Sequence, residues 1–154
     1  PILRAQGHGH ILGTSSAVGI YSNPLIGYYC SSKFAFEAIY DSLSKEVAVF
    51  GIKVTLIEPG AYNTEFGSTE SLKIASKKLP DYDDLKNQLM KNLQKMERGN
   101  PIATSDAIFA VVDAENPPLR LLLGKNDLPH IQQIYSERIQ EWEIWKPISQ
   151  AAQG

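Results

Sequence analysis

Two short apolar runs, separated by one long helical stretch, constrain the fold of this chain more than any other feature. The runs are GHILGTSS at residues 9–16 and IKVTLIEPG at residues 52–60, the second closed by Pro-Gly. Short apolar runs that end at a turn are typical of buried strands. Residues 25–50 lie between them, contain many helix formers and no proline, and precede Gly51, a residue favoured just after a helix. This order predicts two parallel strands joined by a crossover helix.

The rest of the sequence extends this pattern. LRLLLG at residues 119–124 predicts a third strand, and residues 129–150 predict a C-terminal helix. A shorter helix is expected to begin at capping residues 104–106. Apolar side chains form one stripe along the C-terminal helix: Ile131, Ile134, Tyr135, Ile139, Trp142 and Trp145. We therefore expect an α/β fold, a Rossmann-like parallel sheet of about three strands with flanking helices, in a single domain over residues 1–154.

Residues 61–100 differ in character from the segments on either side of them. They are polar and offer two helical segments, residues 68–78 and residues 81–96, separated by Pro80. The second segment repeats apolar residues at helical spacing, which is typical of an amphipathic helix on a surface. We interpret residues 61–100 as a lid over a substrate site.

Charge and cysteine content narrow the classes of partner. The 15 basic and 17 acidic side chains give a net charge of -2 and are spread through the chain, so no basic block predicts nucleic acid or membrane binding. A single cysteine, Cys30, cannot form an internal disulfide and fits a reducing compartment. No apolar run reaches the about 18 residues of a membrane-spanning helix. His8 and His10 lack the further ligands of a metal site. We expect a cytoplasmic protein with small-molecule partners and no metal.

Residues that could take part in catalysis or binding follow both predicted strands. Ser16 ends the first run, Pro59 and Gly60 end the second, and Tyr29 and Lys33 lie near the start of the predicted helix. A spacing of four residues puts two side chains on the same helix face. Because parallel sheets bind ligands beyond the carboxyl ends of their strands, we expect these residues to converge on one cleft.

The residue types in this cleft suit proton exchange with a carbonyl or an alcohol. A phenol exchanges protons near neutral pH only if a neighbouring cation stabilises the phenolate, and Lys33 supplies such a cation. Tyr29 can then donate a proton to a carbonyl oxygen or accept one from an alcohol, while Ser16 holds the same oxygen by a hydrogen bond. The hydride must come from a cofactor, because no side chain donates one.

These residues and their spacing resemble the classical short-chain dehydrogenase/reductase family. Tyr29 and Lys33 match the family's Y-x-x-x-K motif, and Ser16 stands 13 positions before Tyr29, where the family has its catalytic serine. Pro59 and Gly60 match the P-G motif that follows the next strand of the family. Three motifs in the right order and spacing make this a specific resemblance, which extends from the first residues to the third predicted strand.

The resemblance implies an NAD(P)-dependent oxidoreductase that interconverts a carbonyl and a secondary alcohol by hydride transfer. It implies that Tyr29 is the general acid/base, that Lys33 stabilises the phenolate and binds the nicotinamide ribose, and that Ser16 orients the substrate. The cofactor, NAD or NADP, would contact Tyr29, Lys33, Pro59, Gly60, Tyr62 and Thr64.

One motif of the family is absent from this sequence. The glycine-rich T-G-x-x-x-G-x-G turn, whose glycines let the backbone approach the cofactor pyrophosphate, does not occur. The resemblance therefore covers the C-terminal half of the family's domain, and we expect the chain alone to bind cofactor weakly or not at all. Two alternatives stay open: a catalytically inactive fragment, and a relative that regulates or binds a partner.

The predicted helix over residues 25–50 bears on assembly. Its apolar side chains spread around more of the helix than one buried face requires. The family packs this helix in a dimer contact, so the resemblance implies a homodimer or homotetramer formed through residues 25–50.

Overall fold

The computed structural model describes residues 1–66 and 79–154, which form two compact units. The first consists of Pro1–Gly60 and Leu119–Gly154, and the second is Ala61–Pro118. The predicted helical segment 68–78 lies outside the described residues. The prediction that residues 61–100 form a lid stays a prediction.

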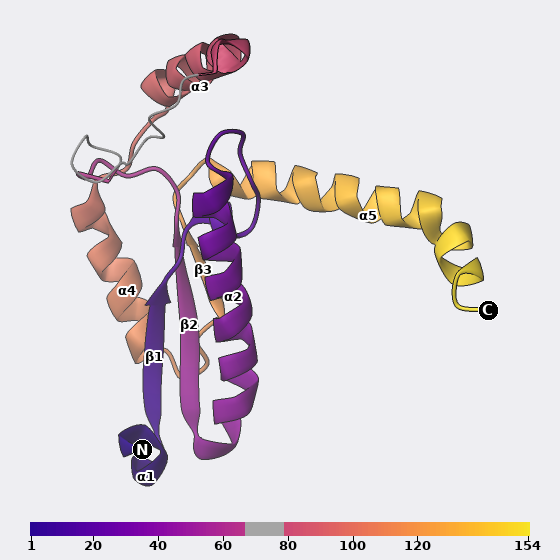
Figure 1. Ribbon diagram of the computed structural model, residues 1–154. Helices are drawn as coiled ribbons and strands as arrows, with labels where there is room; N and C mark the ends of the chain where they lie inside the picture. Colours follow the sequence, from indigo (N-terminus) through magenta and orange to yellow (C-terminus); the bar gives the residue numbers. More distant parts are fainter. Residues whose placement is uncertain (67–78) are drawn as a thin grey trace. The chain divides into compact units, whose positions relative to one another are not determined.

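A parallel sheet of three strands forms the centre of the first unit (Figure 1). Its strands are β1 (Gly9–Thr14), β2 (Ile52–Pro59) and β3 (Arg120–Leu123), in the spatial order β1-β2-β3. Both strand pairs are parallel. The predicted α/β fold with a Rossmann-like sheet is therefore confirmed. A short helix, α1 (Ile2–Gln6), precedes β1.

The crossover helix α2 (Gly27–Val47) runs along one face of the sheet and continues into a 3-10 turn, Ala48–Phe50 (Figure 1). It begins two residues later than predicted, because Leu25 adopts a left-handed backbone with a φ of 68° that no α-helix contains. Gly51 ends the segment as predicted, also in the left-handed conformation with a φ of 68°.

One part of the core of the first unit lies between α2 and the sheet, and another consists of Ala17, Tyr21 and Ile131. Leu56, in the middle of β2, is completely buried. Its partner in β1 is Gly13, and the Tyr40 ring of α2 lies against that glycine, so a side chain there would collide with the ring. Glycine at this position therefore lets the helix approach the strand closely.

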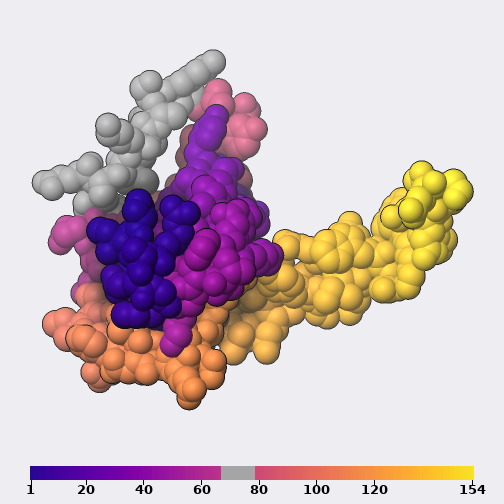
Figure 2. All heavy atoms as spheres, turned by 90° about the horizontal axis from the view of Figure 1, so that it is seen from below, coloured from indigo at the N-terminus to yellow at the C-terminus, as the bar shows by residue number. Residues whose placement is uncertain are grey.

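The C-terminal helix α5 (Asp127–Ala151) begins two residues before the predicted start. Pro129 lies in its first turn, where a missing N–H costs no intrahelical hydrogen bond, so the helix extends past the proline in both directions. Of the predicted apolar stripe, Ile131 is buried and Ile134 packs beside it against Ala17 and Tyr21. The other four members of the stripe are exposed. Figure 2 shows the outer half of α5, in yellow, with no other segment of its unit against it.

In the second unit, the described residues (61–66 and 79–118) form two α-helices. The first, α3 (Asp83–Lys95), follows a 3-10 turn at Pro80–Tyr82 and matches the predicted segment 81–96. The second, α4 (Thr104–Asp113), follows a 3-10 turn at Pro101–Ala103. In the described parts of the chain, no helix combines the length and the apolar character needed to cross a membrane.

The predicted capping residues of α4 do not cap it. Its N-cap is Ala103, which has no side-chain acceptor. The Thr104 hydroxyl donates back to the Pro101 carbonyl at 2.7 Å. The side chain that caps a turn here is Asn100, whose Oδ1 accepts from the Ile102 N–H at 3.0 Å. The prediction was wrong because the 3-10 turn begins the helical segment earlier and takes over the cap.

Candidate active site

Ser16 lies where the carboxyl ends of β1 and β2 are adjacent. It has an extended backbone and caps a 3-10 turn, Ala17–Gly19, by accepting a hydrogen bond from the Val18 N–H at 3.4 Å. Its own hydroxyl donates to the Pro59 carbonyl, also at 3.4 Å. Both bonds are long, so the hydroxyl is held in place weakly and can turn toward another oxygen.

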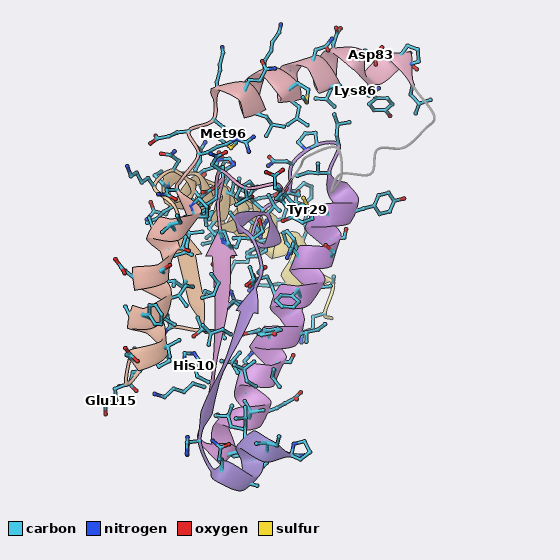
Figure 3. All side chains as sticks on the ribbon, turned by 90° about the vertical axis from the view of Figure 1, so that its left-hand side faces the viewer. His10, Tyr29, Asp83, Lys86, Met96 and Glu115 are labelled. Atoms are coloured by element: carbon cyan, nitrogen blue, oxygen red, sulfur yellow. The ribbon has the colours of Figure 1, made fainter. Side chains whose placement is uncertain are left out.

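Tyr29 and Lys33 come from the first turns of α2. Tyr29 lies at the end of the helix beside the carboxyl ends of β1 and β2 (Figure 3). The Lys33 ammonium donates to the Thr14 carbonyl at 3.1 Å. Its Nζ lies 6.0 Å from the centroid of the Tyr29 ring. A cation at this distance is attracted by the aromatic ring. The two side chains thus share one helix face, as their spacing predicted.

Gly60 forms the turn after β2 and has no room for a side chain. Its N–H donates to the Leu123 carbonyl at 2.9 Å, and a Cβ would collide with the Asp127 carboxylate. The same carboxylate accepts a hydrogen bond from the Tyr21 hydroxyl at 3.1 Å. Burial and, after it, the negative charge of Asp127 together raise the pKa of Tyr21 to about 12, so this hydroxyl keeps its proton. Asp127 therefore joins the turn after β2 to the loop after β1.

The remaining two predicted cofactor contacts, Tyr62 and Thr64, belong to the second unit. There the segment pairs with Gly99. The Asn63 N–H donates to the Gly99 carbonyl, and the Gly99 N–H donates to the Ala61 carbonyl, both at 2.9 Å. Thr64 is exposed. The contribution of Tyr62 and Thr64 to a cofactor site stays a prediction.

Two buried acidic residues near the site escaped the sequence analysis. Glu37 is 6% exposed and Glu58 is 1% exposed, and both contact Arg120. Burial, followed by the charge of Glu37 and a hydrogen bond with Glu37, raises the pKa of Glu58 to about 8, although the charge of Arg120 offsets part of the shift. The sequence signal that could have marked Glu58 is a carboxyl group directly before Pro59, at the end of a mostly apolar run.

Residues 1–74 match the family model described as short chain dehydrogenase. The 3-ketodihydrosphingosine reductase of Bacteroides thetaiotaomicron is 33% identical over 139 residues, which are 89% of this chain and 50% of that protein. The NADPH-dependent 3-dehydrocapnine reductase of Ornithobacterium rhinotracheale is 33% identical over 126 residues, 80% of this chain and 44% of that protein. The chain thus spans about half the length of the curated relatives it matches.

Comparison with solved structures agrees with the sequence matches. The crystal structure of a short-chain dehydrogenase from Streptomyces avermitilis is 29% identical, with a TM-score of 0.83 over 99% of this chain and 55% of that one. The matched family model, the curated relatives, and the parallel sheet beside Ser16, Tyr29 and Lys33 lead to one conclusion: this chain belongs to the short-chain dehydrogenase family.

Proposed function

We propose that this chain contributes the proton-transfer residues of an NAD(P)-dependent oxidoreductase, which interconverts a carbonyl and a secondary alcohol by hydride transfer. The observation that carries the proposal is the position of Lys33. Its Nζ lies 6.0 Å from the Tyr29 ring centroid, while its hydrogen bond to Thr14 anchors it at the end of β1. Two relatives are named as reductases, one of them NADPH-dependent, which supports the reaction class and a nicotinamide cofactor.

The residues present suit a nicotinamide cofactor. An ammonium group has three N–H donors, and in the described residues the one hydrogen bond of Lys33 goes to Thr14, which leaves donors for the hydroxyl groups of a ribose. The turn at Pro59 and Gly60 offers backbone without a bulky side chain at its second residue. We propose that these residues hold the cofactor together with Tyr29, Tyr62 and Thr64. A bound nicotinamide supplies the hydride.

The chain's own residues move the proton. In the reductive direction, the Tyr29 hydroxyl donates its proton to the carbonyl oxygen as that oxygen gains negative charge. The Lys33 ammonium stabilises the resulting phenolate, and in the oxidative direction the phenolate accepts the alcohol proton. The Ser16 hydroxyl turns from the Pro59 carbonyl to donate to the substrate oxygen, which stabilises the developing charge.

Turnover by the whole protein tests this function. We expect NADH or NADPH to be consumed in the presence of some member of a panel of ketones and aldehydes, and one of the two cofactors to be preferred. Binding of NADH or NADPH without turnover of any carbonyl or alcohol would instead support a regulatory or binding role. The absence of both binding and turnover would support an inactive fragment.

We also propose a cytoplasmic homodimer or homotetramer that associates through α2. The outward side of this helix exposes Ile39, which is 62% exposed and lines a shallow groove with Ala38, Ser42, Leu43 and Glu46. Apolar side chains in a groove on a helix surface suit burial against a second copy. Sedimentation of the whole protein is expected to give a dimer or a tetramer, and Ile39→Glu is expected to give a smaller species. A wild-type protein that sediments as a monomer would contradict this assembly.

A further inference from the structure

Two carboxyl groups and one guanidinium meet between α2 and the sheet. Glu37 belongs to α2, Glu58 to β2 and Arg120 to β3. The Arg120 Nε donates to Glu37 Oε2 at 3.2 Å and lies 3.5 Å from Glu58 Oε1. The second distance is too long for a strong hydrogen bond. One cation, itself 41% exposed, therefore faces two carboxyl groups that are almost completely buried.

The hydrogen bonds around these carboxyl groups are incomplete if both are ionised. Oε1 of Glu37 and Oε1 of Glu58 are buried and have no hydrogen-bond partner among the described residues. An ionised carboxylate only accepts hydrogen bonds, so two of them cannot satisfy each other. A single proton changes this, because a neutral carboxyl group donates to its neighbour and removes one buried charge.

The same carboxyl groups lie next to the elements that carry the candidate site residues. Glu58 directly precedes Pro59, whose carbonyl accepts the hydrogen bond from Ser16. Glu37 lies one helical turn after Lys33 on α2. Glu37 also lies close to Gly19 of the loop after β1, because a Cβ added at Gly19 would be 3.0 Å from the Glu37 Cγ. The pair thus touches the loop, the strand end and the helix that carry the proposed chemistry.

We propose that Glu37 and Glu58 share one proton at neutral pH and, with Arg120, act as positioning residues that hold Ser16 and the turn after β2 against α2. The positioning role rests on the proposed function, whereas the shared proton does not. Loss of the proton to solvent leaves two negative charges in contact and loosens the strand end from the helix.

Few other charged groups face this pair. From α2, Asp41 lies 3.9 Å from Arg120 and pairs with Lys45 at 2.9 Å. The hydrogen bond to Lys45 lowers the pKa of Asp41, so this group stays ionised while the pair titrates. On the β1 side, the neutral hydroxyl of Ser15 and Glu37 Oε1 both border Gly19, where an added Cβ would approach them to 2.8 and 3.2 Å. Among the described groups at this place, Glu58 is the one whose pKa is raised.

The stability of the protein should fall as the pair loses its proton. Glu58 has a raised pKa in the folded protein, so its stabilising contribution is fully present below its ordinary value of 4.5 and is lost as pH rises through about 8. We expect the urea midpoint of the whole wild-type protein to decrease between about pH 5 and about pH 9. Glu58→Gln is neutral at every pH and still donates a hydrogen bond to Glu37. The urea midpoint of this variant should therefore decrease much less than that of wild type over the same pH range. The exposed Glu141→Gln should behave as wild type.

Two further readouts complete the test. The infrared spectrum of wild type at neutral pH should contain a protonated carboxyl band that is absent in Glu58→Gln and disappears above about pH 8. The decrease of kcat/KM at alkaline pH should be several-fold smaller in Glu58→Gln than in wild type.

Four results would contradict these proposals. A Glu58→Gln stability profile that parallels that of wild type, or a wild-type spectrum without the carboxyl band, would overturn the shared proton. An equal alkaline decrease of kcat/KM would overturn the positioning role, whereas absence of turnover in every protein at every pH would refute the proposed function.

Discussion

Tyr29→Phe is expected to lower kcat of the whole protein by about 100- to 10,000-fold, the contribution typical of a positioned general acid or base. The change removes a single hydroxyl and keeps the ring that lies 6.0 Å from the Lys33 ammonium. The helix and the aromatic contact therefore survive, and the missing proton donor is the main loss. Steady-state turnover at saturating cofactor measures the effect.

The neighbouring tyrosine provides a matched control. Tyr28 is 98% exposed and stands one residue earlier on the same helix turn. Tyr28→Phe removes the same hydroxyl from a side chain that points elsewhere, so its kcat should equal that of wild type. Equal activity of Tyr29→Phe and Tyr28→Phe would contradict the role of Tyr29 as general acid/base.

Leu56→Ala is expected to lower the free energy of unfolding of the whole protein by about 2–5 kcal/mol, because the residue is completely buried and its removal leaves a cavity. Leu56 lies between Gly13 of β1 and Arg120 of β3, so the cavity opens where all three strands meet α2. Urea unfolding measures the change.

An exposed leucine controls for this substitution. Leu128, in the first turn of α5, is 52% exposed. Leu128→Ala should change the free energy of unfolding by no more than about 0.5 kcal/mol. Similar losses from Leu56→Ala and Leu128→Ala would show that the core does not lie between α2 and β2.

The strands and α2 were predictable because the residues that determine each of them are close together in the sequence. The run before Pro59 contains its own β-branched residues and its own terminator, and Gly51 marks the end of the helix segment from its position alone. The spacing of Tyr29 and Lys33 likewise needs only helical geometry. These features depend on residues a few positions apart.

Other features depend on residues that are distant in the sequence, and no local pattern predicts them. Glu37, Glu58 and Arg120 come from three different elements and meet only when the helix lies on the sheet. Tyr21 and Asp127 are likewise joined across most of the chain. Leu25 has a left-handed backbone and lies before the start of α2, although leucine is a good helix former.

The central claim is that the Lys33 ammonium acts on the reaction through the Tyr29 phenol, and a double-mutant cycle on kcat at saturating cofactor tests it most directly. The cycle compares Tyr29→Phe, Lys33→Met and the double variant in the whole protein. If the two residues act as a unit, the double variant is no slower than Tyr29→Phe alone, since nothing remains for the ammonium to stabilise. If the two losses multiply, Lys33 acts independently of Tyr29 and the claim is wrong.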